Sequence, residues 1–149
     1  MALKRRLIFI PVFAVVVVVS ATVARAEGVQ ADTCGFSAKG RLIGCLDDAA
    51  DCSLIVYWRR QSRWFMTQES APKDPTPPAS VAAELIRPGR WKVTTWPSRR
   101  VIGAVVATNA ARSRWRITNR AGTRVATARG PGGPQMGMLL LHFSRDVFC

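Results

Sequence analysis

Arginine occupies every second position between residues 112 and 116, and Trp115 lies within this alternation. A guanidinium group binds carboxylate and phosphate oxygens through paired hydrogen bonds. Side chains of a β-strand point alternately to opposite faces, so a strand here would separate the arginines from Trp115 and Ile117 and space them about 7 Å apart. The pattern predicts a polyanion-binding strip made of Arg112, Arg114, Arg116, Arg120 and Arg124.

The same alternation has a second interpretation. Charged side chains on an edge strand prevent it from pairing with a strand of another chain. On this interpretation the arginines protect the fold from aggregation and bind nothing. A row of like charges repels itself, which favours an anionic partner but does not require one.

The chain is strongly basic, with 22 lysines and arginines against 9 aspartates and glutamates. Residues 85–149 hold twelve basic residues and one acidic residue, whereas residues 27–84 hold six basic and eight acidic residues. A positive field concentrated on one part of a protein attracts polyanions. We therefore expect the partner to be an anionic polymer, such as nucleic acid or an acidic polysaccharide, or an anionic membrane surface.

Residues suited to catalysis are scarce. The sole histidine, His142, lies in an apolar segment typical of a core strand. Ser144 would share its strand face, but such a pair arises by chance in many sequences. The sequence contains no G-x-S-x-G, H-E-x-x-H or glycine-rich phosphate-loop motif. The cysteine spacing also lacks the C-x2-C pair typical of zinc sites. We expect neither an enzyme nor a bound cofactor or metal.

The cysteines are Cys34, Cys45, Cys52 and Cys149. An even number in a small exported protein indicates disulfides, and four cysteines allow three connectivities. We favour one local bridge within residues 34–52 and a second bridge from Cys149 to the remaining cysteine. The long closure would stabilise the fold by up to about 5 kcal/mol, because it constrains the unfolded chain.

Residues 1–26 have the layout of a secretory signal peptide. Basic residues at positions 4–6 precede an apolar run, and Ala24 and Ala26 form a small-residue cleavage pattern. An uncleaved membrane anchor is the alternative, but the run is shorter than the roughly twenty apolar residues that span a bilayer. We expect a single secreted domain over residues 27–149, extracellular or, in a bacterium, periplasmic.

Short apolar segments separated by turn residues predict a mostly β chain. Residues 54–68 indicate two strands joined near Gln61 and Ser62, and Asn119 with Gly122 would form the turn of another hairpin. The other expected elements are a disulfide-held loop region at 27–53, a proline-rich loop at 70–80, one or two helical turns at 81–86, strands at 91–96, 101–108, 114–118, 123–128 and 136–143, and a flexible loop at 129–135.

These elements predict a fold class and a layout of charge. Many short strands with turns every eight to twelve residues are typical of a small sandwich or barrel. We expect such a fold, stapled by disulfides, with at most one short helix. Residues 91–143 would form its basic, β-rich part.

Aromatic residues alternate with arginines near residue 60. Such a cluster suits stacking on bases or sugars. We favour the simpler interpretation, in which the aromatic rings belong to the core and the arginine side chains lie over them. The cluster comprises Tyr57, Trp58, Trp64 and Phe65 with Arg59, Arg60 and Arg63.

The segment TCGFSAKGRLIGCLDDAADCS, residues 33–53, resembles the opening of small secreted cysteine-rich proteins of filamentous fungi. That group commonly begins with T-C-G-aromatic and has two further cysteines at similar gaps. The matching positions here are Thr33, Cys34, Gly35, Phe36, Cys45 and Cys52. The group usually continues with an adjacent cysteine pair, which this chain lacks. The resemblance implies secretion and disulfides but no biochemical activity.

The sequence therefore predicts a small secreted, non-catalytic protein that binds an anionic surface or polymer, as an effector or an antimicrobial-type factor. The alternative is a protein-binding module, such as an enzyme inhibitor that presents residues 129–135 or 70–80 to a host or target protein. A third interpretation is a shifted reading frame after about Ile55, because cysteine then disappears until the last residue.

Overall fold

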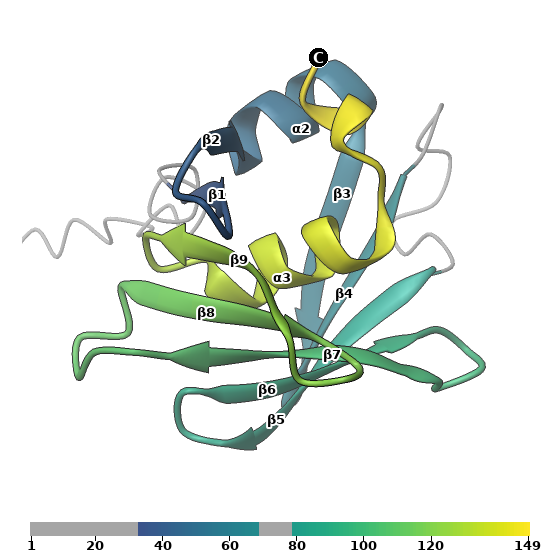
Figure 1. The fold of residues 1–149 in the computed structure, drawn as a ribbon. Coiled ribbons are helices and arrows are strands. Elements are labelled where there is room, and N and C mark those ends of the chain that lie inside the picture. The colour runs from purple at the N-terminus through teal and green to yellow at the C-terminus, as the bar shows by residue number, and fades with distance from the viewer. Residues whose placement is uncertain (1–32, 69–78) are drawn as a thin grey trace, which may run out of the picture.

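A computed structural model describes residues 33–68 and 79–149. The chain is mostly β, as predicted. It forms a nine-stranded antiparallel sheet that curls into a half-barrel around a helix (Figure 1). The proposed signal peptide and residues 70–78 of the proline-rich loop lie outside the described residues.

The strands follow one another in space almost as they do along the chain. The sheet order is β2-β1-β9-β8-β7-β6-β5-β4-β3, so consecutive hairpins account for most of it. The strands are β1 (Cys34–Ser37), β2 (Leu42–Cys45), β3 (Ile55–Arg60), β4 (Arg63–Gln68), β5 (Val81–Arg87), β6 (Arg90–Thr95), β7 (Val101–Ala107), β8 (Arg114–Asn119) and β9 (Arg124–Arg129).

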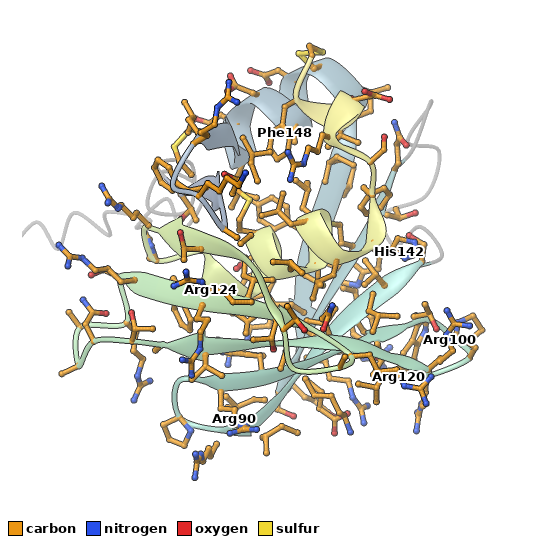
Figure 2. The ribbon with its side chains drawn as sticks, viewed as in Figure 1. Arg90, Arg100, Arg120, Arg124, His142 and Phe148 are labelled. Atoms are coloured by element: carbon orange, nitrogen blue, oxygen red, sulfur yellow. A yellow bond between two sulfur atoms is a disulfide. The ribbon has the colours of Figure 1, made fainter. Side chains whose placement is uncertain are left out.

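The first strand of the chain joins the sheet beside the last one. β1 pairs with β9 through Cys34 opposite Arg129, which leaves β2 and β3 as the two edges of the sheet. Helix α2 (Leu46–Ser53) connects these edge strands directly. The 3-10 helix η1 (Arg145–Phe148) packs against α2, and Phe148 lies against Gly44 (Figures 1 and 2). The gap in the half-barrel is thus spanned by helical segments.

Helix α3 (Gly133–His142) lies in the hollow of the curled sheet and contributes the centre of the core. Met136, Met138 and Leu139 are fully buried in one apolar cluster with inward-facing residues of the strands. The helix approaches the sheet closely at Gly137, where a Cβ atom would overlap the side chain of Val105 on β7.

The structure contains the two disulfides that the sequence predicts, and it selects one of the three possible connectivities. Cys34 is bonded to Cys45 within the β1–β2 hairpin, and Cys52 at the end of α2 is bonded to Cys149. The second bridge joins residues 97 positions apart. It therefore ties the segment between the edge strands to the end of the described chain.

Two predicted elements are wrong, because one short apolar segment was assigned to helix instead of strand and another to strand instead of helix. Residues 81–86 belong to strand β5, and Pro88 with Gly89, taken as a helix stop, form the turn to β6. Gly89 has a φ of 77°, which suits this turn position. Residues 136–143 are not a strand, because most of them belong to α3, with Pro134 in its first turn. A helix surrounded by sheet is apolar on all sides and shows no helical periodicity.

Other boundaries also shift. The supposed loop region 27–53 contains β1, β2 and α2 in its described part, and the supposed flexible loop 129–135 is shortened by the start of α3. Within the described residues there are two α-helices, where at most one short helix was expected. The predicted strands within 54–68 and the hairpin around Asn119 are confirmed.

The close approach at Gly137 predicts a coupled effect of two substitutions. We expect Gly137→Ala to lower the free energy of unfolding by about 1 kcal/mol, because overpacking costs roughly 1–3 kcal/mol and exceeds the gain of about 1 kcal/mol in helix propensity. In a Val105→Ala background the added methyl group has room, so Gly137→Ala should then be neutral or stabilising. Urea denaturation of the four proteins measures both effects, and equal losses in both backgrounds would contradict this packing.

The two disulfides should contribute unequally. Replacing Cys52 and Cys149 by serine is expected to cost up to about 5 kcal/mol, and replacing Cys34 and Cys45 up to about 3 kcal/mol, because the loops closed by the bridges differ greatly in length. Urea midpoints of the two double variants provide the comparison. A larger loss in the Cys34 and Cys45 variant would contradict the chain-entropy argument for this protein.

Candidate anion-binding face

Strand β8 has the two-faced character that the sequence predicts. Trp115 and Ile117 are 4% and 0% exposed and point to α3, whereas Arg114 and Arg116 are exposed on the outer face of the sheet. The indole Nε1 of Trp115 donates a hydrogen bond of 2.8 Å to the carbonyl oxygen of Gly130. The inward residues thus fix the strand, and the arginines alternate with them.

β8 is not an edge strand. It pairs with β7 on one side and with β9 on the other, so neither side is open to another chain. The interpretation of its arginines as protection of a free edge is therefore wrong.

Arginines from three strands converge on this outer face. Arg114 lies opposite Arg129 of β9, and Arg116 lies opposite Val106 of β7, whose other neighbour is Arg90 of β6. All are exposed. We call the resulting surface the arginine face, and it comprises Arg90, Arg114, Arg116, Arg124 and Arg129. Two of these residues, Arg90 and Arg124, are labelled in Figure 2.

Two adjoining hollows mark the arginine face. The larger, about 560 Å³, is lined by Arg90, Arg116 and Arg124 together with small residues of β7 and β8. The other, about 290 Å³, is lined by Arg114, Arg116, Arg124 and Arg129. Arg116 and Arg124 belong to both, and no carboxylate of the described residues lines either one. The surface is a shallow trough with cationic walls.

Within the described part of the chain, no carboxylate forms an ion pair with an arginine of this trough. The two ion pairs among residues 33–68 and 79–149 both involve Glu84, which lies 3.6 Å from Arg63 and 3.9 Å from Lys92. Arg114 and Arg129 are direct cross-strand neighbours of like charge, a destabilising arrangement. The guanidinium carbon of Arg129 lies 5.0 Å from the centroid of the Phe36 ring, which holds this side chain over β1.

The structure divides the predicted strip. Arg114, Arg116 and Arg124 come together, but Arg112 and Arg120 lie in turns at opposite ends of β8 and line neither hollow of the arginine face. Arg112 has a left-handed φ of 51°, so the strand alternation does not reach it. Arg120 lies in the β8–β9 turn, at the same end of the sheet as Arg100 (Figure 2).

Sequence reasoning missed Arg90 and Arg129. The hairpin around Asn119 has a register shift between Ile117 and Thr118, and only this shift brings Arg129 opposite Arg114, so counting outward from the turn would not have paired them. Arg90 belongs to the face because β6 pairs with β7, which places Arg90 opposite Val106. The sequence does not show which residues of these two strands pair.

The aromatic cluster near residue 60 lies on both faces of the sheet. Tyr57 and Trp64 pack against the main core, as favoured from the sequence. Trp58 stacks on Phe65 on the outer face, at a centroid distance of 5.8 Å, and Phe65 contacts Trp96 edge-on at 5.1 Å. The guanidinium groups of Arg63 and Arg99 lie over the Trp96 ring, 5.8 Å and 5.0 Å from its centroid.

His142 occupies the last turn of α3 and not a core strand. Its side chain is exposed and contacts the Phe143 ring edge-on at 4.9 Å, and partial burial lowers the pKa of its imidazole below 6.5. The Ser144 hydroxyl lies 3.5 Å from the Asp146 carboxylate. Within the described residues, no group of three histidine, cysteine or acidic side chains is placed to hold a metal ion.

Among residues 33–68 and 79–149, no helix has the length and apolar character needed to cross a bilayer. Comparisons with known proteins leave the arginine face as the main guide to function: no family model matches the chain, and no significant match was found among curated proteins or solved structures.

Proposed function

We propose that the protein is a secreted, non-catalytic binding protein that holds an anionic polymer along the arginine face. The observation that carries this proposal is the direct pairing of Arg114 with Arg129 in the interior of the sheet, beside two hollows that none of the described carboxylates lines. An arrangement that costs stability in the free protein is accounted for when a bound anion removes the repulsion. The two disulfides support a location outside the cytoplasm.

The shape of the arginine face favours a linear polymer over a flat membrane surface. Arginines two residues apart on a strand are about 7 Å apart, a spacing that suits successive charges along an extended chain. The two hollows share Arg116 and Arg124, so they form a continuous trough across β9, β8 and β7. A strand of nucleic acid or an acidic polysaccharide fits a trough better than a bilayer does.

The two alternative functions receive less support. An inhibitor could present residues 129–135 or 70–80. In the first segment Gly132, Gly133, Pro134 and Gln135 are buried at the start of α3, and residues 70–78 of the second lie outside the described residues. A shifted reading frame after Ile55 would not be expected to complete a sheet with the preceding segment, yet β1 pairs with β9 along four residues.

The proposed binding surface is tested with two variants that each lose three arginines, one inside the trough and one outside it. The variant Arg114→Ser/Arg116→Ser/Arg124→Ser should elute from heparin at much lower salt than the native protein. The control Arg99→Ser/Arg100→Ser/Arg120→Ser loses the same charge outside the trough and should elute close to the native protein. Equal losses in both variants would show that net charge alone governs binding and would overturn the proposal.

The salt dependence of binding should reveal the number of contacts. Fluorescence anisotropy with a labelled single-stranded oligonucleotide gives log Kd against log salt concentration. Loss of three phosphate contacts should reduce the magnitude of this slope by about 2 in the trough variant, because each contact on a single strand contributes about 0.7. Vesicles with anionic headgroups serve as the second probe, and tighter binding to vesicles than to heparin or the oligonucleotide would contradict the preference for a polymer.

Because Arg114 and Arg129 repel each other, we expect removal of one of them to raise stability and to weaken anion binding. We expect Arg114→Thr to raise the free energy of unfolding by about 0.2–1 kcal/mol at low salt, because it removes a like-charge pair and places a β-branched residue in a strand. The gain should shrink at high salt, where charges are screened. Heparin affinity should fall in the same variant. A stability loss at low salt would contradict the repulsion, and unchanged heparin affinity would contradict the binding role.

A further inference from the structure

A row of side chains crosses the outer face of the sheet from β3 to the arginine face. Each member lies opposite the next one on the neighbouring strand, so the row runs perpendicular to the strands. It begins with Arg60, Arg63, Glu84 and Lys92. It continues through Ala104 and Thr118 to Arg124, and these last three residues line the larger hollow of the trough. We call it the cross-strand row.

The cross-strand row extends the positive surface well beyond the trough. Glu84 is its one carboxylate, and it lies 3.6 Å from Arg63 and 3.9 Å from Lys92. Four basic side chains therefore face one acidic side chain, and Arg60 and Arg63 are direct neighbours of like charge. The row crosses seven strands, a path of about 29 Å at the usual strand spacing. Such a path suits several units of an extended anionic polymer.

An accessible tryptophan lies beside the β3 end of the row. Trp58 precedes Arg60 by two residues on β3, so both side chains lie on the outer face. Its ring stacks on Phe65 at a centroid distance of 5.8 Å and an interplanar angle of 22°. Phe65 is 8% exposed and supports the indole from beneath, whereas Trp58 itself is partly exposed.

The exposed part of the Trp58 indole is free to stack on a ligand. Among the described residues, no ring other than that of Phe65 and no guanidinium group lies over it. Trp96, by contrast, already has two guanidinium groups over its ring. Trp58 is therefore the member of the outer aromatic cluster that is best placed to receive a further ring.

The combination of a cationic path with an accessible indole distinguishes between the two kinds of anionic polymer. Proteins that bind single-stranded nucleic acid follow the phosphates with basic side chains and stack bases on aromatic rings. The charged groups around each ring of an acidic polysaccharide leave little apolar surface for an indole. In a duplex the bases are stacked on one another, so they are not available to Trp58.

We propose that the polymer is a single-stranded nucleic acid, whose phosphates follow the trough and the cross-strand row and one of whose bases stacks on Trp58. This inference rests on the proposed binding of an anionic polymer at the arginine face. It adds the class of polymer, the direction in which the strand crosses the sheet, and the side chain that receives a base.

The class of polymer is tested with two labelled DNA strands of equal length. One is an ordinary single-stranded oligonucleotide, and the other is an abasic strand that keeps the phosphates and lacks the bases. In fluorescence anisotropy the full chain should bind the ordinary strand about tenfold more tightly, because only that strand can stack a base on an indole. Equal affinity for the two strands would overturn the assignment to nucleic acid.

Trp58→Leu removes the aromatic ring and keeps an apolar side chain against Phe65. It should weaken binding of the ordinary strand about tenfold and leave abasic-strand affinity and heparin elution unchanged. The slope of log Kd against log salt concentration should also stay the same, because no phosphate contact is lost. Trp58→Phe, which keeps a ring, should retain most of the preference for bases. A preference that survives in Trp58→Leu, or an equal loss of heparin binding, would overturn the stacking role.

The path of the strand is tested by Arg60→Gln, with Arg145→Gln as the control that loses the same charge on η1. Only Arg60→Gln should reduce the magnitude of the salt slope for the oligonucleotide, by about 0.7 for one lost phosphate contact. Equal slopes in both variants and the native protein would overturn the path along the cross-strand row.

These experiments separate the two proposals. If Arg114→Ser/Arg116→Ser/Arg124→Ser weakens heparin binding while Trp58→Leu and Arg60→Gln change nothing, polymer binding stands and the assignment to nucleic acid fails. If the triple variant keeps its affinity for both heparin and the oligonucleotide, polymer binding at the arginine face fails as well.

Discussion

The packing of α3 inside the curled sheet is the contact on which the rest of the structure depends. Its residues contribute the centre of the core, and Gly137 lets the helix approach Val105 without intervening side chains. A helix held so close requires the strands to bend around it. The bend gives the sheet an inner face that is fully apolar at its centre and an outer face that is free to carry charge.

That division explains how one short chain can hold two unlike surfaces. Trp115 and Ile117 secure β8 from within, so Arg114 and Arg116 add little to folding and can be placed for another purpose. The fold tolerates the repulsion between Arg114 and Arg129 because β8 is paired on both sides and because a disulfide joins residues 97 positions apart. Stability is therefore concentrated on the inner side of the sheet, and charge is concentrated on the outer side.

The sequence was informative wherever a local rule applied. The alternation in β8 and the turn at Asn119 follow from spacing and residue type within short segments, and both are found in the structure. The even number of cysteines predicted two disulfides, but their pairing depends on which segments the fold brings together. The arginine face was only partly predictable, because Arg90 enters it through the pairing of β6 with β7. Arg112 was assigned wrongly because the strand begins two residues later than the alternation suggested.

Burial in the half-barrel removed the signal that distinguishes helix from strand. The segment around Leu139 is apolar on every side because sheet surrounds it, so neither a period of two nor a period of 3.6 is visible. The reverse error at Val81 arose from Pro88 and Gly89, which end helices and make hairpin turns equally well. In both cases the decisive information is which element lies alongside, and this depends on the whole fold.

The pairing of β1 with β9 also constrains the order in which the protein can assemble. The two strands come from opposite ends of the described chain, so the hairpin formed by β1 and β2 emerges first and must wait for its neighbour. Contacts between such distant segments form late, since the intervening chain must be brought together before they contribute. Until β9 arrives, one side of β1 is an unpaired strand edge that other chains can contact. A chain interrupted before β9 would thus lack Arg124 and Arg129, two of the five members of the arginine face, and would leave an unpaired strand edge in place of β9.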